Sequence, residues 1–86
     1  MELTKKILNE EGLHARPAGI LAKKASGFQS KIEIIFKGRT VNAKSSMSLM
    51  TLGLSKDSEF NLRAEGSDAD QALQQLSQLI DDQFKG

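Results

Sequence analysis

The segment EFNLRAE, residues 59–65, constrains the fold more than any other part of the chain, because apolar and polar side chains alternate along it. Phe60, Leu62 and Ala64 would point to one side of an extended chain, and the residues between them to the other side. This pattern is typical of an antiparallel sheet with one buried and one solvated face. The apolar face must be covered by another layer of secondary structure.

Three other segments carry weaker strand signals. Residues 31–37 alternate in the same way, and residues 39–43 follow after a turn at KGR, so the two segments are predicted to form a hairpin. Near the N-terminus, Leu3 and Ile7 would share one face of a strand that the NEEG segment then ends. The side chains expected to point inward from the hairpin are Ile32, Ile34, Phe36, Val41 and Ala43.

Two segments have helical spacing instead. From Ala15 to Ser26, apolar side chains recur at intervals of three and four residues, and Gly27 can end this helix because glycine enters the left-handed region without a Cβ clash. The segment from Ala69 to Ile80 has the strongest helical pattern in the chain. Each helix has a single apolar stripe, which indicates that it packs on the sheet.

A third, short helix is predicted over residues 47–52, because Ser45 and Ser46 are both suitable N-caps and Gly53 can end it. The order of elements is then β-α-β-β-α-β-α. We therefore predict an α+β fold of the open-faced two-layer β-sandwich kind, in which three helices cover one face of a four-stranded antiparallel sheet. A length of 86 residues suits one core, so residues 1–86 are expected to form a single domain.

The composition argues against several kinds of function. Twelve basic and eleven acidic residues leave a net charge of +1, so no bulk field attracts nucleic acid or a membrane. The chain has no cysteine and one histidine, which leaves no disulfide framework and no zinc site, and we expect neither a metal nor a cofactor. No signal peptide is visible and no apolar run approaches about 18 residues, so a cytoplasmic protein without membrane insertion is expected.

The only histidine, His14, stands directly before the helix predicted from Ala15, and the only proline, Pro17, falls in the first turn of that helix. The first amides of a helix lack intrahelical partners, and the helix dipole makes this end positive. The imidazole is therefore expected to be mostly neutral and nucleophilic, and an anion on the ring would meet the backbone amides of Ala15 and Arg16. The guanidinium of Arg16 could also bind phosphate oxygens.

These residues alone fit other functions too. A histidine with a purely structural role as a helix cap would give the same sequence pattern. A hydrolase with a Ser-His-carboxylate triad is disfavoured, because only Glu10 and Glu11 are near enough in sequence to orient the ring and the chain is too small for a substrate cleft. A nucleic-acid-binding sheet is also disfavoured, because the strand phenylalanines Phe36 and Phe60 are expected to face inward.

Two motifs together, GLHARPAG at residues 12–19 and VNAKSSMSLMTLGL at residues 41–54, resemble those of the HPr family, the histidine-containing phosphocarriers of the bacterial sugar phosphotransferase system. The resemblance covers essentially the whole chain. It implies that His14 accepts a phosphoryl group on Nδ1 from phosphorylated enzyme I, which phosphoenolpyruvate charges, and passes it to the IIA domain of a sugar permease. It also implies that Arg16 stabilises the transferring charge, and that the protein is a stoichiometric carrier and not an enzyme. A monomer is expected, since the face around His14 must stay free for partners.

The resemblance further implies a docking surface and a regulatory site. Soft methionine side chains and a basic rim suit reversible docking on unrelated partners. The residues expected to form this surface with Arg16 are Gly19, Ile20, Lys23, Lys44, Met47 and Met50. In many Gram-positive relatives a kinase phosphorylates the serine that follows the lysine, and the product binds a catabolite-control transcription regulator. That serine is Ser45 here. The family usually has an apolar residue at the next position, where this chain has Ser46, so a kinase would meet two adjacent hydroxyls and Ser46 is the alternative.

Two related roles stay open on the sequence. A nitrogen-branch phosphocarrier would use the same chemistry with a different IIA partner. A purely regulatory relative would bind partners without carrying phosphate, but such relatives have lost the active histidine, which is present here as His14.

Overall fold

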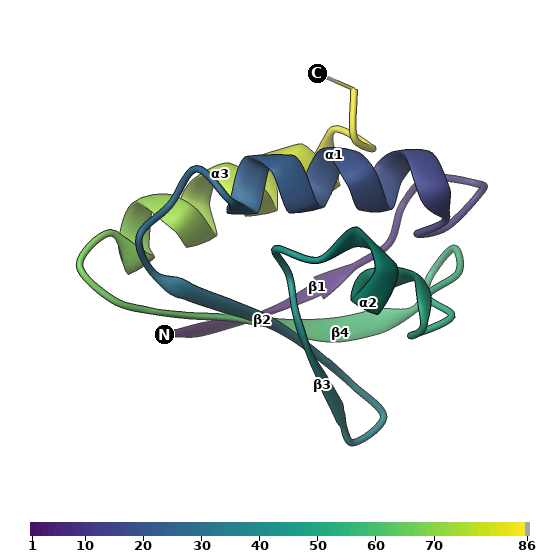
Figure 1. The fold of residues 1–86 in the computed structure, drawn as a ribbon. Coiled ribbons are helices and arrows are strands. Elements are labelled where there is room, and N and C mark those ends of the chain that lie inside the picture. Colours follow the sequence, from purple (N-terminus) through teal and green to yellow (C-terminus); the bar gives the residue numbers. More distant parts are fainter. Residues whose placement is uncertain (86) are drawn as a thin grey trace.

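A computed structural model describes residues 1–85. It contains four strands and three helices in the predicted order. The elements are β1 (Glu2–Lys6), α1 (Ala15–Ala25), β2 (Lys31–Phe36), β3 (Arg39–Asn42), α2 (Ser46–Met50), β4 (Glu59–Glu65) and α3 (Ala69–Asp81). The strands form one antiparallel sheet in the order β1-β4-β2-β3. All three helices lie on the same side of this sheet (Figure 1), which confirms the predicted α+β architecture.

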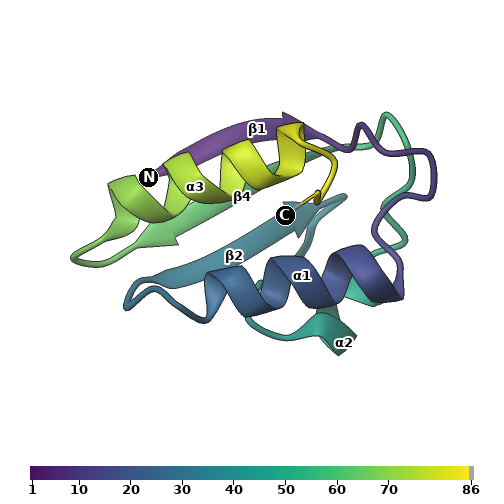
Figure 2. The same ribbon diagram turned by 90° about the horizontal axis from the view of Figure 1, so that it is seen from above.

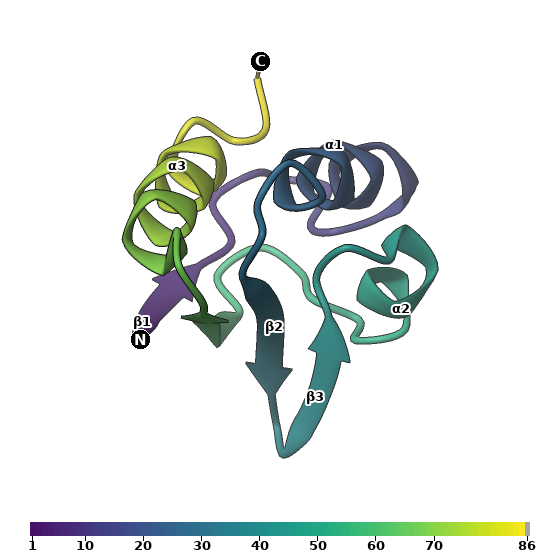
Figure 3. The same cartoon turned by 60° about the vertical axis from the view of Figure 1, so that its left-hand side comes forward.

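The helices divide the covered face between them. Viewed from above, α1 and α3 run side by side over the sheet (Figure 2). From one end, α3 lies over β1 and β4, while α2 sits beside α1 next to β3 (Figure 3). The buried side chains of the strands and of the helical stripes meet between these layers, and they include Leu21, Ile34, Leu62 and Leu76.

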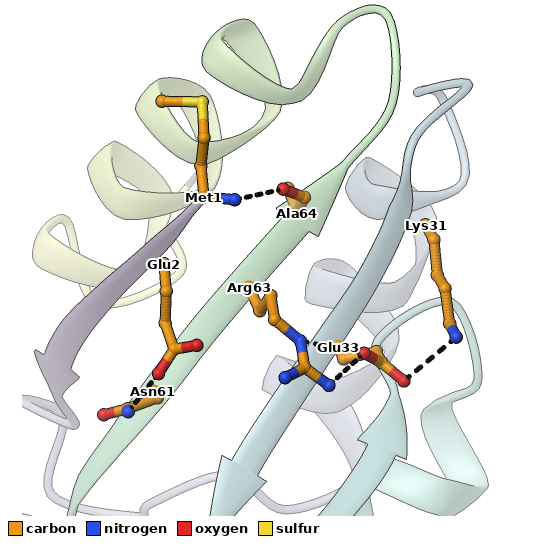
Figure 4. A network of polar contacts seen from close by, with 7 residues as sticks. All are labelled: Met1, Glu2, Lys31, Glu33, Asn61, Arg63 and Ala64. Atoms are coloured by element: carbon orange, nitrogen blue, oxygen red, sulfur yellow. Dashed lines mark hydrogen bonds and ion pairs between the residues drawn. The ribbon is translucent and has the colours of Figure 1, made fainter.

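The other face of the sheet is polar, as the alternation predicts. Glu33 and Arg63 are cross-strand partners on this face, and Nη2 of Arg63 donates to a Glu33 carboxylate oxygen at 2.6 Å. Nζ of Lys31 lies 3.6 Å from the other carboxylate oxygen (Figure 4). The hydrogen bond from Arg63 lowers the pKa of Glu33 and raises that of the guanidinium.

Some predicted details differ from the structure. Ile7 is buried, but Leu3 is 41% exposed, because it lies on an edge strand where no helix covers it fully. The short helix begins at Ser46, with Ser45 as its N-cap, and it ends at Met50 before the predicted Leu52. At this end of the helix, the guanidinium of Arg39 on β3 donates to the carbonyl and hydroxyl oxygens of Thr51.

The predicted inward residues of the hairpin are not buried equally. Ile32, Ile34 and Ala43 are fully buried, whereas Phe36 and Val41 are partly buried and pack against the edge of the core. Both partly buried residues lie near the turn of the β2–β3 hairpin, and β3 is an edge strand.

The C-terminal segment adds a core residue that no periodic pattern indicates. Phe84 follows the end of α3 and is 1% exposed. Its amide donates to the carbonyl oxygen of Leu79, and both Gln83 and Phe84 have positive φ angles, of 58° and 62°. This left-handed pair turns the chain back so that the aromatic ring enters the core. Within residues 1–85, no helix is long and apolar enough to cross a membrane.

Candidate functional site

His14 is the N-cap residue of α1, with extended backbone angles (φ −98°, ψ −161°). Its carbonyl oxygen accepts the first hydrogen bond of the helix, from the amide of Ala18 at 2.9 Å. Its side chain is exposed and makes no capping hydrogen bond with the described residues. The helix geometry leaves the amides of Ala15 and Arg16 without intrahelical partners. The imidazole therefore stands in solvent at the positive end of an eleven-residue helix.

Arg16 and Lys23 lie along the solvent side of α1. Both side chains are exposed, and because they are two helical turns apart they share nearly one direction. Gly19 lies between them, and a Cβ atom placed on it would meet no other atom within 4 Å. Ile20 is partly buried against the core, and with Lys23 it lines a groove toward α3.

The connection that carries His14 is bound to the α2–β4 loop. The amide of Ile7 donates to the carbonyl oxygen of Ser58, and the amide of Leu13 donates to that of Leu54 at 2.9 Å. Between these two points, an exposed ion pair joins Glu10 to Lys56 at 2.9 Å. This pairing lowers the pKa of the Glu10 carboxyl and raises that of Lys56.

The short helix α2 presents its methionines outward. Met47 is 75% exposed and Met50 is 41% exposed, so neither is a core residue. Leu49 between them is fully buried and anchors the helix. The hydroxyl of Ser45 accepts a hydrogen bond from the amide of Ser48 at 3.2 Å, so Ser45 fills the N-cap position and Ser46 is the first helical residue.

Lys44 does not lie beside His14. Its ammonium donates to the carbonyl oxygen of Phe28 at 2.8 Å, just beyond the C-terminal end of α1. His14 stands at the other end of the same helix. The ammonium of Lys44 is therefore at the opposite end of α1 from His14, and the prediction that Lys44 lies on the rim around His14 is wrong.

A family model described as the phosphorylation site of the PTS HPr component matches residues 1–82. The chain belongs to the HPr family. It is 45% identical over 76 residues to the phosphocarrier protein HPr of Mycoplasma capricolum, an alignment that covers 88% of this chain and 85% of that protein.

Solved structures of HPr-family proteins have the same fold. An HPr of Thermoanaerobacter tengcongensis is 43% identical, with a TM-score of 0.94 over 98% of this chain and 94% of that one. The catabolite repression protein Crh of Bacillus subtilis, described as a dimer with a swapped domain, is 34% identical, with a TM-score of 0.79 over 95% and 94% of the two chains.

In this HPr-family chain, no motif or periodicity indicates the residues that hold the connection before His14. The sequence predicts only that Asn9 and Gly12 end a strand, yet both residues are buried. Gly12 has a φ of 72°, and a Cβ atom on it would lie 2.6 Å from the carbonyl oxygen of Leu54. A glycine in a short connection can mark such a close approach, but the partner loop is remote in sequence.

Proposed function

We propose that this protein carries a phosphoryl group on Nδ1 of His14 in the sugar phosphotransferase system. The donor is phosphorylated enzyme I, which phosphoenolpyruvate charges, and the acceptor is the IIA domain of a sugar permease. The proposal is supported above all by the position of the exposed imidazole at the N-terminal end of α1.

The transfer needs only a neutral ring nitrogen and charge stabilisation. The lone pair of Nδ1 forms the new N–P bond as the bond between phosphorus and the donor breaks, and Nε2 keeps the ring proton. The amides of Ala15 and Arg16 and the guanidinium of Arg16 then stabilise the negative oxygens. Transfer to a IIA domain reverses these steps on a new acceptor, so the protein is a covalent intermediate and not an enzyme that releases a product.

Docking uses the surface that α1 and α2 share. We assign to it Arg16, Gly19, Lys23, Met47 and Met50, because the first three lie along the outer side of α1 and the methionines are exposed on the neighbouring helix. Ile20 contributes at its rim. The bond from Lys44 to Phe28 argues for a structural role of that lysine.

Ser45 is a second site for phosphorylation, by an HPr kinase, with Ser46 as the alternative. Ser45 is partly exposed at the start of α2, the helix that carries the two exposed methionines. A phosphate there would add negative charge next to the docking surface and weaken exchange with acidic partners. The similarity to Crh supports a link to a catabolite-control regulator. In this scheme the chain acts in the cytoplasm as a single monomeric domain, and it binds no cofactor or metal.

The deciding experiment uses phosphoenolpyruvate and enzyme I. The protein should gain one phosphate that is stable in alkali and lost in acid. Because His14 is the only histidine, phosphohistidine in this chain can have one location. His14→Ala should abolish the label, and Lys24→Ala, on the same helix, should keep it. A label that persists in His14→Ala would remove His14 from this role.

A regulatory protein that binds partners without carrying phosphate is the second candidate, supported by the likeness to Crh. This candidate function predicts that the protein binds its partners but accepts no phosphate from enzyme I. The nitrogen branch differs only in the IIA partner, so transfer assays with sugar-specific and nitrogen-specific IIA domains distinguish it.

A further inference from the structure

Asn9 lies in the β1–α1 connection, five residues before His14, and only 4% of it is exposed. Within residues 1–85, Asn9 and Ser30 are the two buried polar residues. A buried amide side chain is costly unless its hydrogen bonds are made, so its position needs an explanation.

The side chain of Asn9 closes the turn that leads to His14. Its Nδ2 donates to the carbonyl oxygen of Gly12 at 2.7 Å, and the amide of Gly12 donates back to the carbonyl oxygen of Asn9 at 3.2 Å. The turn requires the left-handed conformation that Gly12 adopts.

These contacts hold one peptide unit from both sides. The carbonyl group of Gly12 accepts from Asn9, and the amide of Leu13 in the same peptide unit donates to Leu54. Both Leu13 and Leu54 are buried, so this peptide plane cannot turn without breaking a buried hydrogen bond. The next residue in the chain is His14, whose backbone direction follows from that plane.

Asn9 has these contacts at a cost. Its Oδ1 atom is buried and accepts no hydrogen bond from the described residues. An apolar residue would avoid this cost but could not donate to Gly12. The amide is therefore explained by the need for a donor at this point and not by overall stability.

We propose that Asn9 is a positioning residue for His14: its amide fixes the Gly12–Leu13 peptide unit and thereby the direction in which the imidazole is presented to the incoming phosphoryl group. This inference rests on the proposed function of His14. Because docking uses other residues, loss of the amide should lower the rate of transfer within the complex with enzyme I and leave the affinity for enzyme I unchanged.

The test compares Asn9→Ala with Ser30→Ala. Ser30 is the matched control, since it is equally buried and donates through its hydroxyl to Asp68, but it lies beyond the opposite end of α1. At a temperature where both variants are folded, Asn9→Ala should lower kcat for transfer from enzyme I about 10-fold with KM unchanged, and Ser30→Ala should leave both unchanged. Equal losses in the two variants, or a change in KM alone, would overturn the proposal.

Hydrogen exchange gives a readout that needs no partner protein. In Asn9→Ala, protection of the Leu13 amide should fall about 10-fold more than protection of the Leu62 amide in the core, whereas Ser30→Ala should leave their ratio unchanged. Unchanged protection of Leu13 contradicts the role of Asn9. If the native protein accepts no phosphate, the proposed function fails, and the exchange result still decides whether Asn9 holds this peptide unit. If Asn9→Ala does not fold, Asn9→Leu, which is similar in size and also lacks the donor, replaces it in both measurements.

Discussion

The carboxylate of Asp68 accepts hydrogen bonds from both the amide and the hydroxyl of Ser30, at 2.9 and 2.5 Å. Its second oxygen accepts from the amide of Gln29 at 2.8 Å. One side chain at the start of α3 thus holds the α1–β2 connection.

This arrangement predicts a pH-dependent effect of Asp68→Asn. The hydrogen bond from the Ser30 hydroxyl, with that from the Gln29 amide, lowers the pKa of Asp68 below its unfolded value of about 3.9. Its stabilisation is therefore complete above about pH 5 and is lost as the pH falls through the folded-state pKa. Thermal unfolding should show a midpoint several degrees lower for the variant at pH 7, and the difference should shrink toward pH 2. A difference that is constant with pH would contradict this account.

Gly12→Ala should destabilise the protein by about 3 kcal/mol, because it combines a strained backbone with a clash. The added Cβ would lie 2.6 Å from the carbonyl oxygen of Leu54. Gly38→Ala is the control, since Gly38 also has a positive φ but has open space around it, and about 1 kcal/mol is expected there. Urea unfolding measures both values, and equal costs would argue against the close approach.

Phe84→Ala should cost about 3–5 kcal/mol of unfolding free energy, as for other fully buried aromatic residues. Phe36→Ala should cost clearly less, because Phe36 is only partly buried. Both values come from urea unfolding. A loss below about 1 kcal/mol for Phe84→Ala would mean that the C-terminal segment is not part of the core.

Ser45→Ala should lower stability by about 1 kcal/mol through loss of the N-cap, and Ser46→Ala should have little effect. With ATP and an HPr kinase, Ser45→Ala should also lose the acid-stable phosphate. If the label instead disappears only in Ser46→Ala, the modified residue and the capping residue are different serines.

Lys23→Met and Lys44→Met distinguish the roles of the two lysines that the sequence predicts on the docking surface, of which we assign only Lys23 to it. Removal of the exposed charge of Lys23 should raise KM for enzyme I about threefold at low salt. Lys44→Met should leave KM unchanged and lower stability, because its ammonium is bound to the carbonyl oxygen of Phe28. A raised KM for Lys44→Met with an unchanged KM for Lys23→Met would mean that Lys44, and not Lys23, belongs to the docking surface.

The sequence predicts those parts of the molecule that local periodicity determines. Alternation places Leu62 and Ile34 in the core, and the helical stripes place α1 and α3 on the sheet. The position of His14 as N-cap follows from Pro17 and the start of the apolar stripe, and the structure agrees.

The remaining features depend on contacts between distant segments. The hydrogen bond from the Leu13 amide requires Leu54, 41 positions away, and the hydrogen bond from Lys44 to Phe28 joins two different loops. Phe84 reaches the core only through two left-handed residues, which no spacing rule indicates. Leu3 has the apolar character of a core residue, but its place on an edge strand leaves it exposed.

The polar side of the sheet offers a place to attach a probe. Thr40 is exposed and shares that side with its cross-strand partner Ile35, whereas His14 belongs to the helical layer. Because the chain has no cysteine, Thr40→Cys would introduce a unique thiol. A fluorophore coupled there could report on each encounter with a partner while the surface of α1 and α2 remains unobstructed.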